Sequence, residues 1–247
     1  MVWVDGNHEA FAFGHSIASA AAECSGATPL SSEVACCSSA DACVFSALDV
    51  APNVTFLGAG ETLRVGHTLF VGCCAWWDFQ YAAPECDPAA CRDRFNTVAL
   101  PQLWFTAAPA DGAPFSEAIL AAAERDYTGL RDAIAAAQSD GSVRHIVVAT
   151  HTVPHHTLLR KGVYPKDLED AAMYGSSLME KIPEVDTAKK IALWVFGHSH
   201  AGGDARIGHI QYLGHPRGRP DDYGRAAYCP RVVNVGTAAA PAPDTAC

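Results

Sequence analysis

The sequence predicts a single α/β domain, and three patterns lead to this prediction. Residues 115–138 place apolar side chains at helical spacing, which is typical of an amphipathic helix. Residues 143–149 and 191–196 are nearly continuous apolar runs of strand length, as expected for strands buried on both faces. A long helix that alternates with such strands is the pattern of the α/β class.

Short strands and one or two helices are expected in the first third of the chain. Residues 2–4 form a β-branched and aromatic run that stops at Asp5-Gly6, which predicts a strand followed by a turn. Residues 10–51 are rich in Ala, Ser and Cys and are compatible with one or two helices and a loop. An antiparallel meander of three strands is predicted next, at residues 54–57, 62–65 and 68–72.

The later elements flank the long helix and the two buried strands. Residues 84–93 contain Pro and Cys and predict an irregular surface loop. Residues 207–213 and 231–235 are expected to be closing strands, and the Ala/Pro-rich tail at 238–247 is expected to be frayed. No linker interrupts the chain, so residues 1–237 are expected to form one domain.

Composition limits the class of protein and its partners. Of the 247 residues, 49% are hydrophobic and 18% are charged, a balance that can bury a core. The formal net charge of -10 disfavours nucleic acid as an obligate partner, because a phosphate backbone would be repelled. A small-molecule or protein phosphoester remains compatible as a substrate, since bound metal ions can reverse the local field.

The sequence predicts no membrane span and assigns no compartment. No apolar run approaches the ~20 residues that a membrane helix needs. Residues 1–4 run directly into the polar residues 5–8, which leaves no room for the basic region and apolar core of a signal peptide. Localisation is therefore left open.

Ten cysteines leave two interpretations open. In a chain of this length, an even number of cysteines does not by itself indicate a disulfide framework. A bridge could staple the cysteine-containing stretches 36–43 or 86–91, which resemble loops. Cys73 and Cys74 lie in an apolar run and are expected in the core, and no paired C-x-x-C spacing indicates a structural zinc site.

Histidine-containing clusters directly follow three of the predicted strands. These clusters are Asn7-His8, His151, and the pair His198 and His200. In α/β folds, ligands bind beyond the carboxyl ends of strands, where several loops converge. Each cluster alone is as compatible with a turn or a hydrogen-bonded histidine as with a site, but their joint occurrence at strand ends predicts one functional site.

The spacing of His198 and His200 suits metal ligands. Alternate side chains of an extended segment share a face at a separation of ~6.5 Å, so both imidazoles can serve one ion or two ions ~3.5–4 Å apart. Neutral imidazole is a ligand for several transition metals, so these histidines do not decide between Mn, Fe, Zn and Ni.

Four segments of the sequence carry a family resemblance. They are G-N-H-E at 6–9, the strand-end His151, G-H-S-H at 197–200 and V-N-V-G at 233–236. In this order they resemble the later motifs of the calcineurin-like metallophosphoesterase family, from residue 2 to about residue 236. The resemblance implies a four-layer α/β fold, a two-sheet β-sandwich flanked by helices, with a dinuclear metal centre at the strand ends.

A role for each matching residue is also implied by the resemblance. Asn7, His151 and His198 would bind one divalent ion, and His200 would bind the other. His8 would be the acid that steadies the transition state or protonates the leaving oxygen, so it is not a ligand. Two divalent ions, Mn, Fe or Zn, would polarise the phosphoryl oxygens and generate the hydroxide that attacks phosphorus. The implied activity is that of a phosphomonoesterase or phosphodiesterase.

The family's first two motifs, D-x-H and G-D, have no counterpart in this chain. Both precede G-N-H-E in the family, so the resemblance implies that N-terminal strands and their ligands are missing here. Asp5 does not match the bridging carboxylate of G-D. Two interpretations follow: an enzyme whose preceding segment is absent from this sequence, or a non-catalytic metal-binding or scaffold protein that keeps the fold. The enzyme is favoured because all of the later-motif residues are in place.

Other basic residues are given lesser roles. A zinc hydrolase of another fold is disfavoured because the H-E-x-x-H pattern is absent. His155-His156 and His209 are interpreted as solvated residues or as supports of the ligands. Arg217 could bind a substrate phosphate through its guanidinium fork, but an ordinary surface arginine is the alternative.

Overall fold

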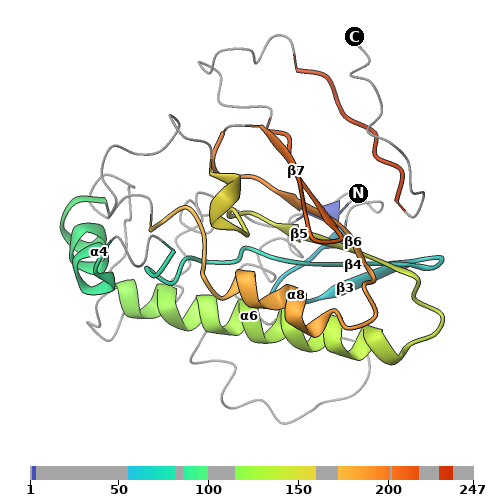
Figure 1. Ribbon diagram of the computed structural model, residues 1–247. Helices are drawn as coiled ribbons and strands as arrows, with labels where there is room; N and C mark the ends of the chain where they lie inside the picture. Colours follow the sequence, from blue (N-terminus) through green and yellow to red (C-terminus); the bar gives the residue numbers. More distant parts are fainter. Residues whose placement is uncertain are drawn as a thin grey trace.

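The computed structural model describes residues 2–3, 55–81, 86–99, 115–159, 172–200, 202–216 and 228–235. A six-stranded mixed sheet forms the centre of this part and makes the fold α/β (Figure 1). In spatial order, the strands are β3 (Thr62–Val65), β4 (Thr68–Cys73), β5 (His145–Thr150), β6 (Ile191–Phe196), β8 (Ile210–Gly214) and β7 (Gly203–Ile207). The four inner strands are parallel, and the two edge strands are antiparallel to their neighbours.

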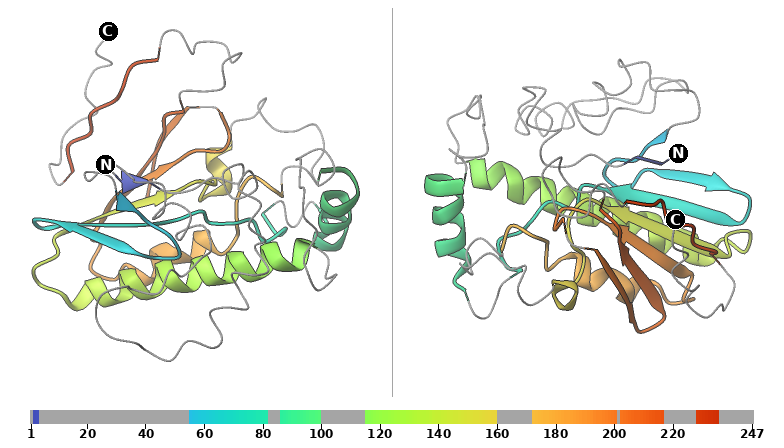
Figure 2. Two further views of the ribbon diagram at one scale, coloured as in Figure 1. Left: turned by 180° about the vertical axis from the view of Figure 1, so that it is seen from behind. Right: turned by 90° about the horizontal axis from the view of Figure 1, so that it is seen from above.

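Helices lie in the connections from β4 to β5 and from β5 to β6, whereas the connection from β6 to β8 holds β7. The α-helices are α4 (Pro88–Arg94), α6 (Phe115–Ser139) and α8 (Ile182–Val185). Shorter turns are the π-helical η1 (Phe95–Ala99) and the 3-10 turns η2 (His156–Leu158) and η3 (Met179–Lys181). Seen from above, α4 lies beyond the N-terminal end of α6 (Figure 2). Within the described ranges, no helix is long and apolar enough to cross a membrane.

The long helix α6 runs along one face of the sheet and builds the main core (Figure 1). Its predicted apolar face is confirmed, because Ile119, Leu130 and Ile134 are completely buried. Across from them, the sheet contributes Trp194 and Tyr212, whose rings stack with centroids 5.7 Å apart. The predicted strands at 143–149 and 191–196 are confirmed as β5 and β6, and Cys73 and Cys74 are buried in this core as expected.

The opposite face of the sheet carries a smaller apolar cluster. It is built on Val147, Leu193 and Leu213, and Val233 and Val235 pack against it. The prediction of a closing strand at 231–235 is wrong, because this segment has no strand pairing although Val233 and Val235 pack against the sheet. The run at 207–213 is not one strand either. A turn at Gly208, with φ +59°, divides it between the hairpin strands β7 and β8.

The predicted antiparallel meander is half correct. β3 and β4 form an antiparallel hairpin, but β2 (Thr55–Phe56) pairs in parallel with β1 (Val2–Trp3) in a separate two-stranded sheet. The turn between β2 and β3 instead packs directly against α6. A Cβ on Gly129 would lie only 1.8 Å from the Ala59 carbonyl oxygen, so the missing side chain permits this close approach.

Residues 88–94 form a helix where the sequence was expected to form a loop. Asp87 caps α4, because its side chain accepts a hydrogen bond from the Ala89 amide at 3.0 Å, and Pro88 occupies the first turn. The Cys86 and Cys91 sulfurs lie 2.9 Å apart in a buried position. Cys229 is disulfide-bonded, and the cysteines of the stretch 36–43 lie outside the described residues.

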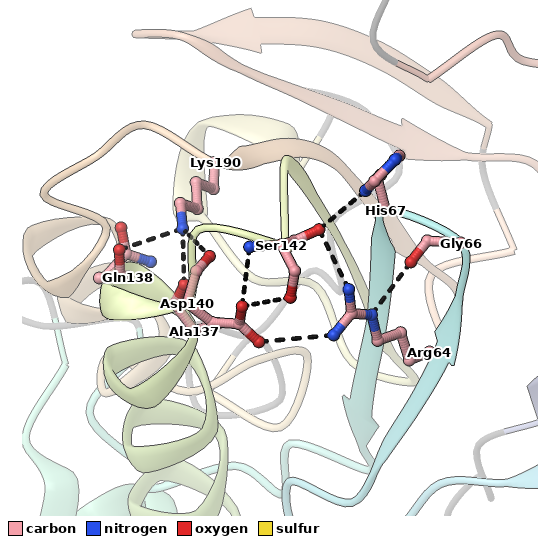
Figure 3. A network of polar contacts seen from close by, with 8 residues as sticks. All are labelled: Arg64, Gly66, His67, Ala137, Gln138, Asp140, Ser142 and Lys190. Atoms are coloured by element: carbon pink, nitrogen blue, oxygen red, sulfur yellow. Dashed lines mark hydrogen bonds and ion pairs between the residues drawn. The ribbon is translucent and has the colours of Figure 1, made fainter.

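A polar network joins the turns at the amino ends of β5 and β6 (Figure 3). Arg64 and His67 both contact the Ser142 carbonyl oxygen, at 3.2 and 3.0 Å, and Arg64 forms an ion pair with Asp140 at 3.5 Å. Hydrogen bonds from Ser142 hold the pKa of Asp140 below its usual value. The Asp140 carboxylate therefore stabilises the fold at pH values above the pKa of the unfolded carboxyl. This stabilisation is lost as the pH falls through the pKa of the folded carboxyl.

Lys190 closes the C-terminal end of α6 from the start of β6. Its Nζ donates to the carbonyl oxygens of Ala137, Gln138 and Asp140 at 2.7, 3.0 and 2.8 Å. The last carbonyls of a helix have no partner within the helix and carry partial negative charge, so a cation is favourable there. These three bonds fix the helix end against the sheet.

Replacing Lys190 with Met is expected to lower the free energy of unfolding by about 1–3 kcal/mol, because the carbonyls lose a charged donor while the aliphatic stem is kept. Urea denaturation followed by circular dichroism measures the change. Lys189→Met is the matched control, since Lys189 is exposed and one position away. Equal stability of K190M and K189M would contradict the assigned role.

Candidate metal centre

The candidate site lies at the edge of the sheet where the parallel strands β4, β5 and β6 end. Cys73 at the end of β4 is paired with Thr150 at the end of β5, and β6 runs in the same direction beside β5. His151 and Gly197 are the first residues beyond β5 and β6. The Gly197 amide donates to the His151 carbonyl oxygen at 2.9 Å, which joins the two strand ends directly.

His151 and His198 face each other across this edge. His151 Nε2 and His198 Nδ1 are 3.0 Å apart, and the ring centroids are 4.9 Å apart. Both residues are half-buried. Two atoms that bind one ion at right angles, with bonds of about 2.1 Å, are themselves about 3.0 Å apart. The two nitrogens thus have the spacing of neighbouring ligands on a single ion.

Hydrogen bonding determines which nitrogens of this pair carry protons. His198 Nε2 lies 3.1 Å from the Met173 carbonyl oxygen, which can only accept, so Nε2 carries a proton and donates it. Neutral His198 then has its lone pair on Nδ1 and accepts from His151 Nε2–H. His198 Nδ1 is therefore the nitrogen suited to bind a metal, with its ring oriented by the bond on the other side.

Aromatic rings enclose His198. Trp77 stacks on it with centroids 6.0 Å apart, and Tyr174 approaches edge-on at 5.2 Å. Trp77 is 1% exposed, and within the described part of the chain its indole N–H has no hydrogen-bond partner. A buried donor left unpaired costs about 1–3 kcal/mol, so this N–H is a group that a bound ligand could satisfy.

The backbone after β6 adopts an unusual conformation. His198 and His200 have φ angles of +63° and +52°, in the left-handed region that non-glycine residues rarely adopt. Such conformations cost of order 1–3 kcal/mol each and are found most often at functional sites. The Ser199 amide donates to the Gly197 carbonyl oxygen at 2.7 Å, which tightens the turn between them.

Hydrogen bonds from two sides hold the segment that follows β4. On α6, the buried carboxylate of Asp126 accepts from the amides of Ala75 and Trp76 at 2.8 and 3.4 Å. From the segment after β5, Thr152 Oγ1 donates to the Ala75 carbonyl oxygen at 2.5 Å, and the Thr152 amide donates to the Cys74 carbonyl oxygen at 3.2 Å. These bonds hold the chain that carries Trp77 against His198.

Only part of the predicted site falls within the described residues. His151 and His198 are brought together as expected, and His200 follows in the same turn with an exposed side chain. Asn7, His8 and Arg217 lie outside the described residues. Trp77 was not singled out from the sequence, and it lies four residues beyond the end of β4 rather than directly at the strand end.

A second group of potential metal ligands lies further along the segment after β5. His155, His156 and Glu180 each offer a ligand atom, and these atoms lie within 4.8 Å of one another, so the group could hold a metal ion. Burial lowers the pKa of His155, against the opposing charge of Glu180. Burial, with a smaller contribution from Glu180, raises the pKa of Tyr212 beside the group to about 12. Both shifts favour the neutral form of the side chain.

His155, His156 and His209 were interpreted from the sequence as solvated residues or as supports of the ligands, and the structure places them in different surroundings. His155 is half-buried, and His209 Nε2 lies 2.7 Å from Oδ2 of the buried Asp186 carboxylate. Glu180 lies 24 residues beyond His156, so no local pattern in the sequence indicated that these side chains meet. The adjacent histidines were the only available signal.

Comparisons with known proteins give only weak structural similarity. No family model matches the chain, and no curated protein matches it. Among solved structures, the chain is similar to phosphopantetheinyl hydrolase (PptH) from Mycobacterium tuberculosis, with a TM-score of 0.45 and 14% sequence identity. The similarity covers 65% of this chain and 54% of that one, so the matched part spans about half of that protein's length. At this level the match is no more than a hint about the fold.

Removing the Asp126 carboxylate should destabilise the edge of the sheet that carries the site. Asp126→Ala is expected to lower the free energy of unfolding by about 2–3 kcal/mol, because buried amides lose a charged acceptor, and Asp126→Asn by about 1 kcal/mol. Chemical denaturation monitored by tryptophan fluorescence provides the measurement. Asp132→Ala on the same helix, where the carboxylate is exposed, should cost less than about 0.5 kcal/mol. Equal stability of D126A and D132A would contradict the assigned role of Asp126.

Proposed function

We propose that this chain is a metal-dependent phosphoester hydrolase whose metal centre lies at the ends of β5 and β6. The convergence of His151 Nε2 and His198 Nδ1 to 3.0 Å is the observation that carries the proposal. Two neutral imidazoles at ligand spacing favour a divalent transition metal. The motif resemblance to metallophosphoesterases supplies the reaction class, since the same two histidines belong to it.

The proposed ligand set extends beyond this pair. Asn7, His151 and His198 would hold one ion, and His200 would take part in holding a second one, with Mn, Fe or Zn as the candidate metals. When bound, such ions stabilise the negative charge of a phosphoryl group and lower the pKa of bound water. His8 would keep its proton and deliver it to the leaving oxygen.

The chain's own residues would orient and enclose the substrate. Met173 and His151 fix the two sides of the His198 ring. Trp77 offers a buried N–H as a donor for a phosphoryl oxygen, and the Arg217 guanidinium would bind the phosphate from outside. We further propose that residues 1–237 form one domain in which β1 and β2 belong to the second sheet of a four-layer sandwich, with 238–247 as a tail.

Loss of either strand-end histidine should abolish metal-dependent hydrolysis. We expect the protein to hydrolyse bis(p-nitrophenyl) phosphate or p-nitrophenyl phosphate when Mn²⁺ is added. His151→Ala and His198→Ala should each lower kcat/KM by at least about 100-fold, since even partners of metal ligands contribute 10–100-fold. Release of p-nitrophenol and bound metal per chain are the two readouts.

His145→Ala is the matched control for these variants. His145 is the first residue of β5, at the opposite end of the strand that His151 follows, so its replacement should leave the rate unchanged. Circular dichroism would verify that each variant is folded. Unchanged hydrolysis in H151A and H198A would contradict the proposed site. Metal bound without turnover would instead identify a non-catalytic metal-binding protein.

A further inference from the structure

The segment after β5 brings two histidine rings to one side of the chain. Neighbouring residues of an extended segment normally point in opposite directions. Here His155 is extended while His156 begins the turn η2, and their rings stack with centroids 4.6 Å apart and an interplanar angle of 23°. Both imidazoles are thereby presented together to η3, which carries Glu180.

Glu180 is fixed against these histidines by two hydrogen bonds. Its Oε1 accepts from the His156 amide at 2.9 Å and lies 2.8 Å from His156 Nδ1. The carboxylate is therefore already oriented towards the imidazoles without an ion. A carboxylate and imidazole in contact have the short separation expected of two ligands to the same cation.

Thr157 orients the ring of His155. The Thr157 amide donates to His155 Nδ1 at 3.2 Å, and the Thr157 hydroxyl lies 2.8 Å from the same nitrogen. Nδ1 therefore accepts, and in the neutral ring the proton lies on Nε2. An ion bound through Nε2 would replace this proton, while the contacts of Nδ1 with Thr157 keep the ring oriented.

We propose that His155, His156 and Glu180 form a second divalent-metal site that prefers a Zn²⁺-type ion. Two imidazoles and one carboxylate are a known ligand set for zinc, which leaves a fourth position for water. The three ligand atoms lie within 4.8 Å of one another. In a tetrahedral zinc site the ligand atoms are about 3.4 Å apart, so the exposed His156 would have to move by up to about 1.4 Å to complete the geometry.

This site shares no ligand with the strand-end histidines. It would bind its ion whether or not His151 and His198 support hydrolysis. An ion held here would connect the segment after β5 with η3, which are already joined by the His156–Glu180 contact. The same segment begins with His151, so the ion would also restrain the chain that leads away from the strand-end pair.

Cobalt titration tests the site with Glu180→Gln as the main variant. The amide oxygen of Gln can still accept both bonds from His156, so the local structure is kept while the charged ligand is lost. Glu184→Gln is the matched control, because Glu184 is exposed and lies four residues further on. Bound Co²⁺ is followed by its visible absorption and by metal analysis, with Zn²⁺ as competitor.

The His198→Ala background separates this site from the strand-end pair. In that background we expect one Co²⁺ per chain to remain, displaced by Zn²⁺, and E180Q to weaken it by at least about 10–100-fold, the loss that even a ligand's partner causes. E184Q should bind as the H198A parent does. Equal binding by E180Q and E184Q, or no Co²⁺ bound by folded H198A, would overturn the proposal, whatever the hydrolysis assays show.

Discussion

The parallel alignment of β4, β5 and β6 is the constraint on which the candidate site depends. Parallel strands end at the same edge of a sheet, so His151 and His198, which are 47 residues apart, meet there. Antiparallel strands joined by a short turn would have placed the two histidines at opposite edges. The parallel arrangement requires crossover connections, and the packing of α6 and α8 against one face of the sheet supplies them.

Polar contacts hold this edge in a conformation that the backbone alone would avoid. His198 and His200 have positive φ angles, and such strain persists only where the surroundings determine the conformation. For His198 these surroundings are the contact with His151, the bond to the Met173 carbonyl oxygen and the stacked ring of Trp77. The same contacts orient Nδ1, so the interactions that offset the strain are those that prepare a ligand atom.

Elements with a strong local pattern could be predicted from the sequence, and elements defined by distant partners could not. The helix at 115–138 and the strands at 143–149 and 191–196 were found because their side-chain pattern is long and continuous. The partner of β2 was missed because pairing with β1 is a long-range choice. The helix α4 was missed although Asp87-Pro88 is a start signal. His151 and His198 could be predicted as site residues because each lies just after a predicted strand. Glu180 could not, because it meets His156 only through tertiary packing.

Locating a bound ion by anomalous diffraction tests the central claim most directly. Crystals of the chain soaked in Zn²⁺ should show an anomalous peak bonded to both His151 Nε2 and His198 Nδ1, at about 2.0–2.1 Å from each nitrogen. The His151 Nε2 proton would be lost as the ion enters. Saturating Zn²⁺ with no peak at this position, and with the two nitrogens still in direct contact at 3.0 Å, would contradict a metal centre at the strand ends.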